Sequence, residues 1–259
     1  MSTYRGIFLA GAAVHFCPFL PYARSMPVSK LLTKLHFAAP VIGPSLLACD
    51  FADLRHEIRQ LEEAGARILH LDIMDGHFVP NISFGVPVVE AVRRSTELPL
   101  DVHLMLSEPA RYVAAFRRAG ADMITVHIEA VPDPRELLNE IRATGAVAGL
   151  SLNPPTPLYK VEDYLEYCDF VLVMSVMAGF GGQEFDPVAL EKLSRLRKLA
   201  GPGFLLSVDG GINRQTIGRC AAAGADLLVA GSAVFSEDNY GQIITELKNL
   251  VELHKTTQV

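Results

Sequence analysis

The chain repeats one structural phrase at regular intervals, and this repetition constrains its fold more than any other feature. Each repeat has an amphipathic helical stretch, a stop of small residues around a glycine, and then a run of apolar, β-branched residues. The stops are Ala64-Gly65-Ala66, Ala119-Gly120-Ala121, Thr144-Gly145-Ala146 and Ala223-Gly224-Ala225. Their glycines are 55, 25 and 79 residues apart, close to two, one and three units of about 26 residues. Because glycine commonly follows a helix C-terminus, the repeating unit is one helix and one strand.

Eight apolar runs have the length and composition of buried strands. They lie at residues 41–46, 68–73, 100–104, 123–127, 147–152, 170–174, 204–208 and 227–230. The stretches between them place apolar residues three or four apart, as at Leu54, Ile58 and Leu61, which predicts helices with one apolar stripe. This pattern predicts a single (β/α)8 TIM barrel over residues 39–259. A doubly wound open sheet is the alternative, but it usually has a glycine-rich turn after its first strand, where this chain has Ser45-Leu-Leu-Ala-Cys-Asp50.

The charge of the barrel segment argues against two classes of partner. Residues 1–49 contain four basic residues and no acidic one, so the rest of the chain has 19 basic and 29 acidic residues and a net charge of −10. Such a surface repels nucleic acid and anionic membranes. No apolar run reaches the roughly 18 residues that a membrane span requires. We therefore expect no nucleic-acid partner and no membrane association.

Residues 1–38 differ from the rest and are predicted to be a short N-terminal extension. An acid-free, largely apolar stretch from Gly6 to Leu20 resembles a signal or transit peptide. An unused upstream start codon is the alternative, because Met26 begins a plausible shorter chain. We expect a chain that begins at Met26 to keep its melting temperature and its turnover. The four cysteines have no short paired spacing, which indicates a reducing, cytoplasmic location, with organelle targeting by residues 1–38 as the alternative.

Three strand-like runs end in side chains that bind metals. His70-Leu-Asp72 and Asp101-Val-His103 each put a histidine and an aspartate two residues apart, hence on one face of a strand, and Asp209 ends a third run. Histidine nitrogen and carboxylate oxygen are ligands of divalent transition metals. One such pair alone is equally compatible with a hydrogen-bonded core pair. Their recurrence at strand ends, where barrels carry their catalytic residues, predicts one site.

Three glycine turns follow the sixth, seventh and eighth predicted strands. They are Gly179-Phe-Gly-Gly182, Asp209-Gly-Gly211 and Gly231-Ser232. In barrels of this type phosphate groups bind at the last two of these loops, through backbone N–H groups that glycine leaves accessible. A phosphate site beside a metal site predicts a small phosphorylated substrate with chelating oxygens, such as a keto sugar phosphate.

The residue types that are absent from the predicted strand ends exclude several classes of reaction. No lysine or arginine lies at a predicted C-terminal strand end, which argues against Schiff-base chemistry. No Ser-His-Asp arrangement or activated cysteine is evident, which argues against acyl transfer. Two carboxylates beside a Lewis acid suit removal of a proton next to a carbonyl and its return. Carboxylates on different strands can act from opposite faces and so invert the carbon.

Seven short stretches form a specific set when they are taken together. They are Gly43-Pro-Ser-Leu-Leu-Ala48, His70-Leu-Asp-Ile-Met-Asp-Gly-His-Phe-Val-Pro-Asn81, Asp101-Val-His-Leu-Met105, Asn153-Pro-Pro-Thr-Pro157, Gly179-Phe-Gly-Gly-Gln183, Val208-Asp-Gly-Gly-Ile-Asn213 and Ala230-Gly-Ser232. With this set the chain closely resembles the ribulose-phosphate 3-epimerase family. The resemblance implies a metal-dependent isomerase that interconverts D-ribulose 5-phosphate and D-xylulose 5-phosphate by inversion at C3 through an enediolate. The implied setting is the pentose phosphate pathway or the Calvin cycle.

The resemblance also implies roles for individual residues. One divalent metal, Zn, Fe(II), Co or Mn, would be held by His70, Asp72, His103 and Asp209, and Asp72 and Asp209 would be the acid/base pair. The implied substrate-binding residues are Ser45, His103, Gly179, Phe180, Gly181, Gly182, Asp209, Gly210, Gly211, Gly231 and Ser232. The implied supporting residues around the enediolate are Met74, Met105 and Met174, for which barrel core filler is an equally good interpretation. No ligand role is implied for His127, and a homo-oligomer is expected.

One departure from the family pattern and three rival functions bear on this prediction. Where the family has Asn-Pro or Glu-Pro before the first glycine turn, this chain has Met177-Ala178, so we expect altered loop mobility or substrate affinity. An epimerase of a six-carbon 2-ketose phosphate, such as allulose 6-phosphate, would share all four metal ligands. A related decarboxylase is disfavoured because no lysine lies near Asp72, and a non-catalytic phosphosugar-binding scaffold because both aspartates are present.

Overall fold

Eight parallel strands form one sheet in the computed structural model, which describes residues 28–256. The strands are β1 Val41–Pro44, β2 Leu69–Met74, β3 Leu100–Met105, β4 Met123–His127, β5 Val147–Leu152, β6 Phe170–Met174, β7 Leu205–Asp209 and β8 Leu227–Ala230. The helices are α1 Val28–Ala38, α2 Leu54–Glu63, α3 Val86–Arg93, α4 Val113–Ala119, α5 Arg135–Ala143, α6 Tyr159–Glu162, α7 Val188–Ala200, α8 Ile217–Ala222, α9 Ser232–Phe235 and α10 Tyr240–Thr256. The predicted barrel of eight βα units is therefore confirmed.

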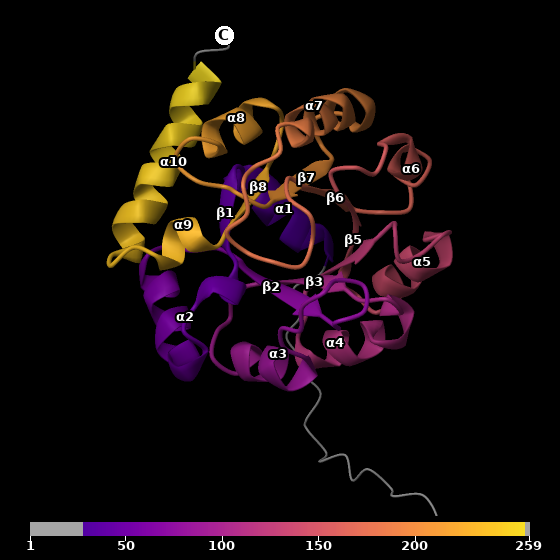
Figure 1. The fold of residues 1–259 in the computed structure, drawn as a ribbon, viewed down its shortest axis with the longest axis horizontal. Helices are drawn as coiled ribbons and strands as arrows, with labels where there is room; N and C mark the ends of the chain where they lie inside the picture. The colour runs from indigo at the N-terminus through magenta and orange to yellow at the C-terminus, as the bar shows by residue number, and fades with distance from the viewer. Residues whose placement is uncertain (1–27, 257–259) are drawn as a thin grey trace, which may run out of the picture.

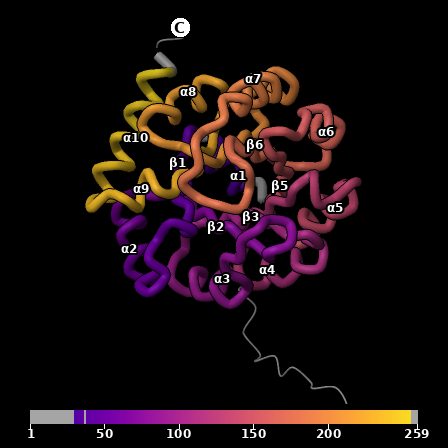
Figure 2. The backbone as a smooth tube through the Cα atoms, in the orientation of Figure 1, coloured from indigo at the N-terminus to yellow at the C-terminus, as the bar shows by residue number. Residues whose placement is uncertain are grey.

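The sheet closes into a ring between β1 and β2. Strands pair in the order β1-β8-β7-β6-β5-β4-β3-β2, and a parallel bridge between Ser45 and His70 joins its two edges. Figure 1 looks along the barrel, with the helices arranged around the strands. The trace in Figure 2 shows α10 on the outside, where it contacts both α8 and α2. Helix α10 thus covers the place where the first and last βα units meet.

Strand ends and helix ends follow from local chemistry. The first strand ends at Pro44 rather than at Leu46, because Ser45 caps a 3-10 turn and its Oγ accepts a hydrogen bond from the Leu47 N–H at 3.3 Å. The four predicted stop glycines all have positive φ, as expected beyond a helix C-terminus. Gly120, for example, ends α4 with φ of +113°.

The barrel interior is apolar at one end and polar at the other. Alternate residues of each strand point inward, and near the N-terminal ends of the strands these include Met123, Val147, Phe170 and Leu205, which form one buried cluster. At the C-terminal ends the inward residues include His103 and Asp209 instead. A second, larger cluster lies between the strands and the surrounding helices. The apolar core thus fills the N-terminal end of the barrel and the layer between strands and helices. The polar residues lie at the C-terminal end, where barrels carry their active sites.

Helix α1 closes the apolar end of the barrel, although the predicted boundary at residue 38 assigns it to the extension. Figure 1 shows α1 behind the strands, within the outline of the ring. Leu31 and Leu35 are 2% and 3% exposed and belong to the same buried cluster as Phe170. The helix and the barrel therefore share one core. The expectations for residues 1–25 lie outside the part of the chain that the structure describes, and they stay predictions.

Replacing Leu35 by alanine should destabilise the barrel, because it leaves a cavity between α1 and the strands. We expect a loss of about 2–5 kcal/mol, and a fall in melting temperature of roughly 2–4 °C for each kcal/mol. Thermal unfolding followed by circular dichroism measures this change. Lys34→Ala, at an exposed position of the same helix, is the matched control and should unfold as the native chain does. An unchanged melting temperature for Leu35→Ala would contradict the packing of α1.

Candidate metal and substrate site

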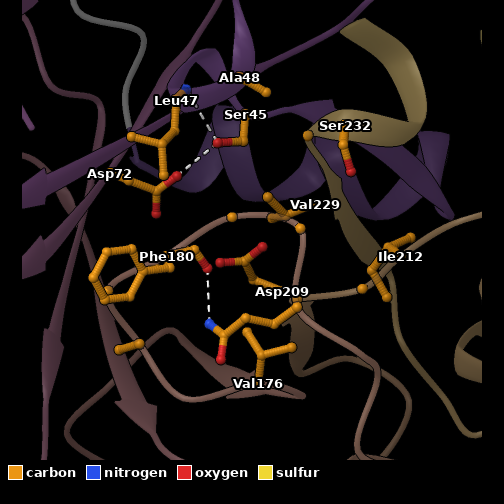
Figure 3. A pocket seen from close by; sticks show the side chains of 18 of the residues that line it. Ser45, Leu47, Ala48, Asp72, Val176, Phe180, Asp209, Ile212, Val229 and Ser232 are labelled. Atoms are coloured by element: carbon orange, nitrogen blue, oxygen red, sulfur yellow. Dashed lines mark hydrogen bonds between the residues drawn. The ribbon is translucent and has the colours of Figure 1, made fainter. Parts of the chain in front are cut away.

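A cavity of about 680 Å³ opens at the C-terminal ends of the strands. Figure 3 shows the carboxylates of Asp72 and Asp209 in this cavity, with Ser45 and Phe180 also at its walls. The predicted substrate-binding and supporting residues that line it are Ser45, Met74, Met105, Met174, Gly179, Phe180, Gly181, Gly182, Asp209, Gly210, Gly211, Gly231 and Ser232. His70 and His103 are not among its lining residues, because they lie buried beside Asp72 at 1% and 0% exposure.

The four predicted metal ligands form one cluster. One ligand atom each of His70, Asp72, His103 and Asp209 lies within 4.8 Å of the other three. The register of β2 and β3 puts Asp72 opposite His103. Asp72 Oδ1 is 3.2 Å from His70 Nε2 and 3.1 Å from His103 Nδ1. These residues could therefore hold a single metal ion.

The surroundings of His70 fit a cation on its inner side. His70 Nδ1 lies 2.8 Å from Asp101 Oδ2, and because a carboxylate accepts, Nδ1 donates and Nε2 faces Asp72. Although burial lowers it, the charges of Asp72 and Asp101 raise the pKa of His70 well above its usual range. The site thus attracts positive charge, from a proton or a metal ion. Two imidazoles and two carboxylates suit zinc, iron(II), cobalt or manganese.

The two cavity aspartates have opposite electrostatic environments. Although burial raises it, the charge of His70 holds the pKa of Asp72 below its usual range. Burial, and then the negative charge of Asp72, raise the pKa of Asp209 to about 7. Near neutral pH one carboxylate is therefore ionised while the other can carry a proton. Such a pair can supply a base and an acid at the same time.

The glycine turn after β7 is required by close contact between two loops. Gly210 and Gly211 have φ of +111° and +58°, which disfavours other residues. A Cβ at Gly210 would lie 2.5 Å from Val176 Cγ2, and one at Gly211 would lie 2.9 Å from the backbone nitrogen of Phe185. The turn after β7 is therefore packed closely against Val176 and Phe185 of the loop between β6 and α7.

Gly211→Ala should disturb this corner, since the new methyl group would meet backbone atoms in a strained conformation. We expect a loss of stability of about 1–3 kcal/mol and a higher KM for a phosphorylated ketose. Thermal unfolding and steady-state kinetics measure the two effects. Gly203→Ala is the control, because a Cβ at Gly203 meets nothing within 4 Å. Equal stability and KM for the two variants would show that the corner does not depend on Gly211.

The loop that departs from the family pattern is held by hydrogen bonds. The Ala178 N–H donates to Asn153 Oδ1 at 3.0 Å, in a buried position. Proline has no N–H and could not make this bond. Asn81 Nδ2 also donates to the Gly179 carbonyl at 2.8 Å. The chain thus exchanges the fixed φ of proline for a bond to Asn153, and altered mobility of this loop stays a prediction.

Three side chains near the cluster are not among the predicted site residues. Asp101 contacts His70, His127 contacts His103, and Glu129 contacts His127. The alternation of β3 predicts Asp101 on one face with His103 as a candidate metal ligand, whereas the structure pairs it with His70. No sequence signal indicated the contact between His103 and His127, which depends on how β3 and β4 lie beside each other.

Similar solved structures support the fold. A thiamine phosphate pyrophosphorylase from Pyrococcus furiosus matches with a TM-score of 0.59 at 18% identity, over 85% of this chain and 98% of that chain. A mutant tryptophan synthase alpha-subunit from the same organism matches with a TM-score of 0.63 at 18% identity, over 83% of this chain and 98% of that one. At such low identity these matches establish the architecture alone.

Sequence relatives are far more similar. A ribulose-phosphate 3-epimerase of Bacillus subtilis is 46% identical over 211 residues, which are 80% of this chain and 97% of that protein. A ribulose-phosphate 3-epimerase of Synechocystis is 46% identical over 214 residues, 81% of this chain and 93% of that protein. Residues 41–235 match the model of the ribulose-phosphate 3 epimerase family. The resemblance seen in the motifs is confirmed, and this chain belongs to the ribulose-phosphate 3-epimerase family.

Proposed function

We propose that this protein is a metal-dependent epimerase that interconverts D-ribulose 5-phosphate and D-xylulose 5-phosphate by inversion at C3. The observation that carries the proposal is the pair Asp72 and Asp209, which reach one cavity from β2 and β7 beside a histidine cluster. These strands are separated by β1 and β8 in the closed ring. Two carboxylates from different parts of the cavity wall can exchange protons with opposite faces of a carbon that is bound between them.

Proton transfer is assigned to the two aspartates. In one direction the ionised Asp72 removes the C3 proton, and the protonated Asp209 delivers a proton to the far face. The roles reverse in the other direction, and both directions share the enediolate of the substrate. Ser45 Oγ donates a hydrogen bond to Asp72 Oδ2 at 2.6 Å, which orients this carboxylate. A divalent ion held by the four-residue cluster would supply Lewis acidity for the negative charge that develops on the substrate oxygens.

Phosphate binding is assigned to the glycine turns. Among the residues that line the cavity in the described part of the chain there is no lysine or arginine. The anion would therefore be held by backbone N–H groups of residues 179–182, Gly210, Gly211 and Gly231, together with Ser232. Apolar walls formed by Met74, Met105 and Met174 would surround the reacting carbons, while core filling remains an equally good interpretation of these methionines.

Partners and location rest on the sequence. A homo-oligomer and a cytoplasmic location stay predictions, with organelle targeting by residues 1–38 as the alternative to the latter. Within residues 28–256 no helix has the length and apolarity that crossing a membrane requires.

The decisive experiment compares two substrates with the metal-loaded protein. C3 epimerisation of D-ribulose 5-phosphate and of D-allulose 6-phosphate is followed side by side by NMR. We expect kcat/KM to favour the five-carbon substrate by about tenfold or more. Preference for the six-carbon substrate would support the alternative function, and turnover of neither would refute the proposal.

A further inference from the structure

A chain of hydrogen-bonding side chains leads outward from His103, away from the cavity. His103 Nε2 lies 2.8 Å from His127 Nε2, and His127 Nδ1 lies 3.0 Å from Glu129 Oε2. Both histidine side chains are fully buried, whereas the Glu129 side chain is 24% exposed. Neither His127 nor Glu129 lines the cavity. His127 and Glu129 are therefore connected to the metal-ligand cluster through His103.

At the outer end of this series of hydrogen bonds, the contacts of Glu129 determine which group donates and which accepts. Glu129 Oε1 accepts the Asn153 N–H at 2.7 Å and the Thr156 hydroxyl. A backbone N–H can only donate, so this oxygen is an acceptor. Lys192 Nζ donates to the carbonyls of Asn153 and Thr156 at 2.9 and 2.8 Å, which holds this loop in place. Glu129 Oε2 is thus left facing His127 as an acceptor.

The acceptor role of Glu129 fixes the position of the proton on His127 and, through it, on His103. Because the carboxylate accepts, His127 donates from Nδ1, and a neutral imidazole then has a bare Nε2. His103 must donate to that bare nitrogen from its own Nε2. The lone pair of His103 is then on Nδ1, the atom that lies 3.1 Å from Asp72 Oδ1 within the cluster. Asp101 does the same for His70 with a single bond of 2.8 Å.

We propose that Glu129 and His127 are positioning residues that hold His103 in the one tautomer whose Nδ1 can bind the metal. The inference rests on the metal site of the proposed function. Both residues act through His103 and touch neither substrate nor metal. The two histidine ligands are therefore oriented by two separate outer partners, Asp101 for His70 and Glu129 through His127 for His103.

Glu129→Gln tests the proposal with almost no change of shape. The Asn153 N–H requires the amide oxygen at the position of Oε1, so the amide NH2 faces His127 Nδ1 and reverses both downstream hydrogen bonds. His103 would then carry its proton on Nδ1, toward the metal. We expect the affinity of the full-length chain for Zn²⁺, measured by competition with a chromophoric chelator, to fall by about 10–100-fold. Glu57→Gln is the matched control, since this buried glutamate accepts a bond from the Tyr240 hydroxyl at 2.6 Å away from the site.

A second measurement needs no variant. Nitrogen-15 NMR of the zinc-loaded native protein should find the His127 proton on Nδ1, and a proton on Nε2 would overturn the proposal. The proposal would also be overturned if Glu129→Gln bound Zn²⁺ with native affinity while His103→Ala bound it weakly. That result would still support the metal site. Equal affinity of the native chain and His103→Ala would instead refute the metal site itself.

Discussion

Asp72→Asn and Asp209→Asn should each lower kcat for epimerisation by about 10²–10⁴-fold, the usual contribution of a general acid or base. An amide of the same shape neither removes nor delivers the C3 proton. Both variants should keep the barrel, because each side chain lies at the cavity and not in the apolar end of the core. Asp163→Asn, at an exposed position, is the control. Activity of either variant within about tenfold of native would contradict the assignment.

Isotope exchange separates proton transfer from metal loss. In D2O the native protein should place deuterium at C3 during epimerisation, because abstraction and return use different carboxylates. In Asp209→Asn the remaining Asp72 can still remove a proton from one epimer and return deuterium to the same face. Exchange without inversion in that variant would support the two-base arrangement. If the variant loses both the exchange activity and the bound metal, Asp209 acts mainly as a metal ligand.

Metal removal should have the other large effect. Chelation should lower kcat by about 10²–10³-fold or more, since a Lewis acid contributes several kcal/mol to such a reaction. Reloading with zinc, iron(II), cobalt or manganese should restore activity to different extents. His103→Ala should lower the metal content, because it removes one of two nitrogen ligands from the cluster. Elemental analysis with parallel kinetics measures both effects.

A surface histidine serves as the control for this experiment. His56 is exposed on α2, so His56→Ala should bind metal and turn over as the native protein does. Full activity in a preparation that elemental analysis shows to be free of metal would rule out the metal-dependent mechanism. Normal metal content in His103→Ala would rule out this ligand set.

The sequence predicted the barrel from its own pattern, and the strand-end pattern together with the family resemblance predicted the four residues of the His/Asp cluster. The helix and strand periods depend on residues a few positions apart, so they can be read from the chain itself. The alternation of β2 put His70 and Asp72 on one face, and the barrel rule brought Asp209 to the same end. The strand limits differ by at most two residues from the predicted ranges, as at β1, where the cap formed by Ser45 ends the strand.

Only the tertiary structure decided which groups surround that cluster. The packing of α1 under the barrel, the bond from Ala178 to Asn153 and the chain from His103 through His127 to Glu129 all join segments that are far apart in sequence. Such contacts depend on strand register and loop packing, which many weak interactions set together and no short motif encodes. The sequence therefore determined which residues can carry the chemistry, and the three-dimensional packing decided how their protons and lone pairs are directed.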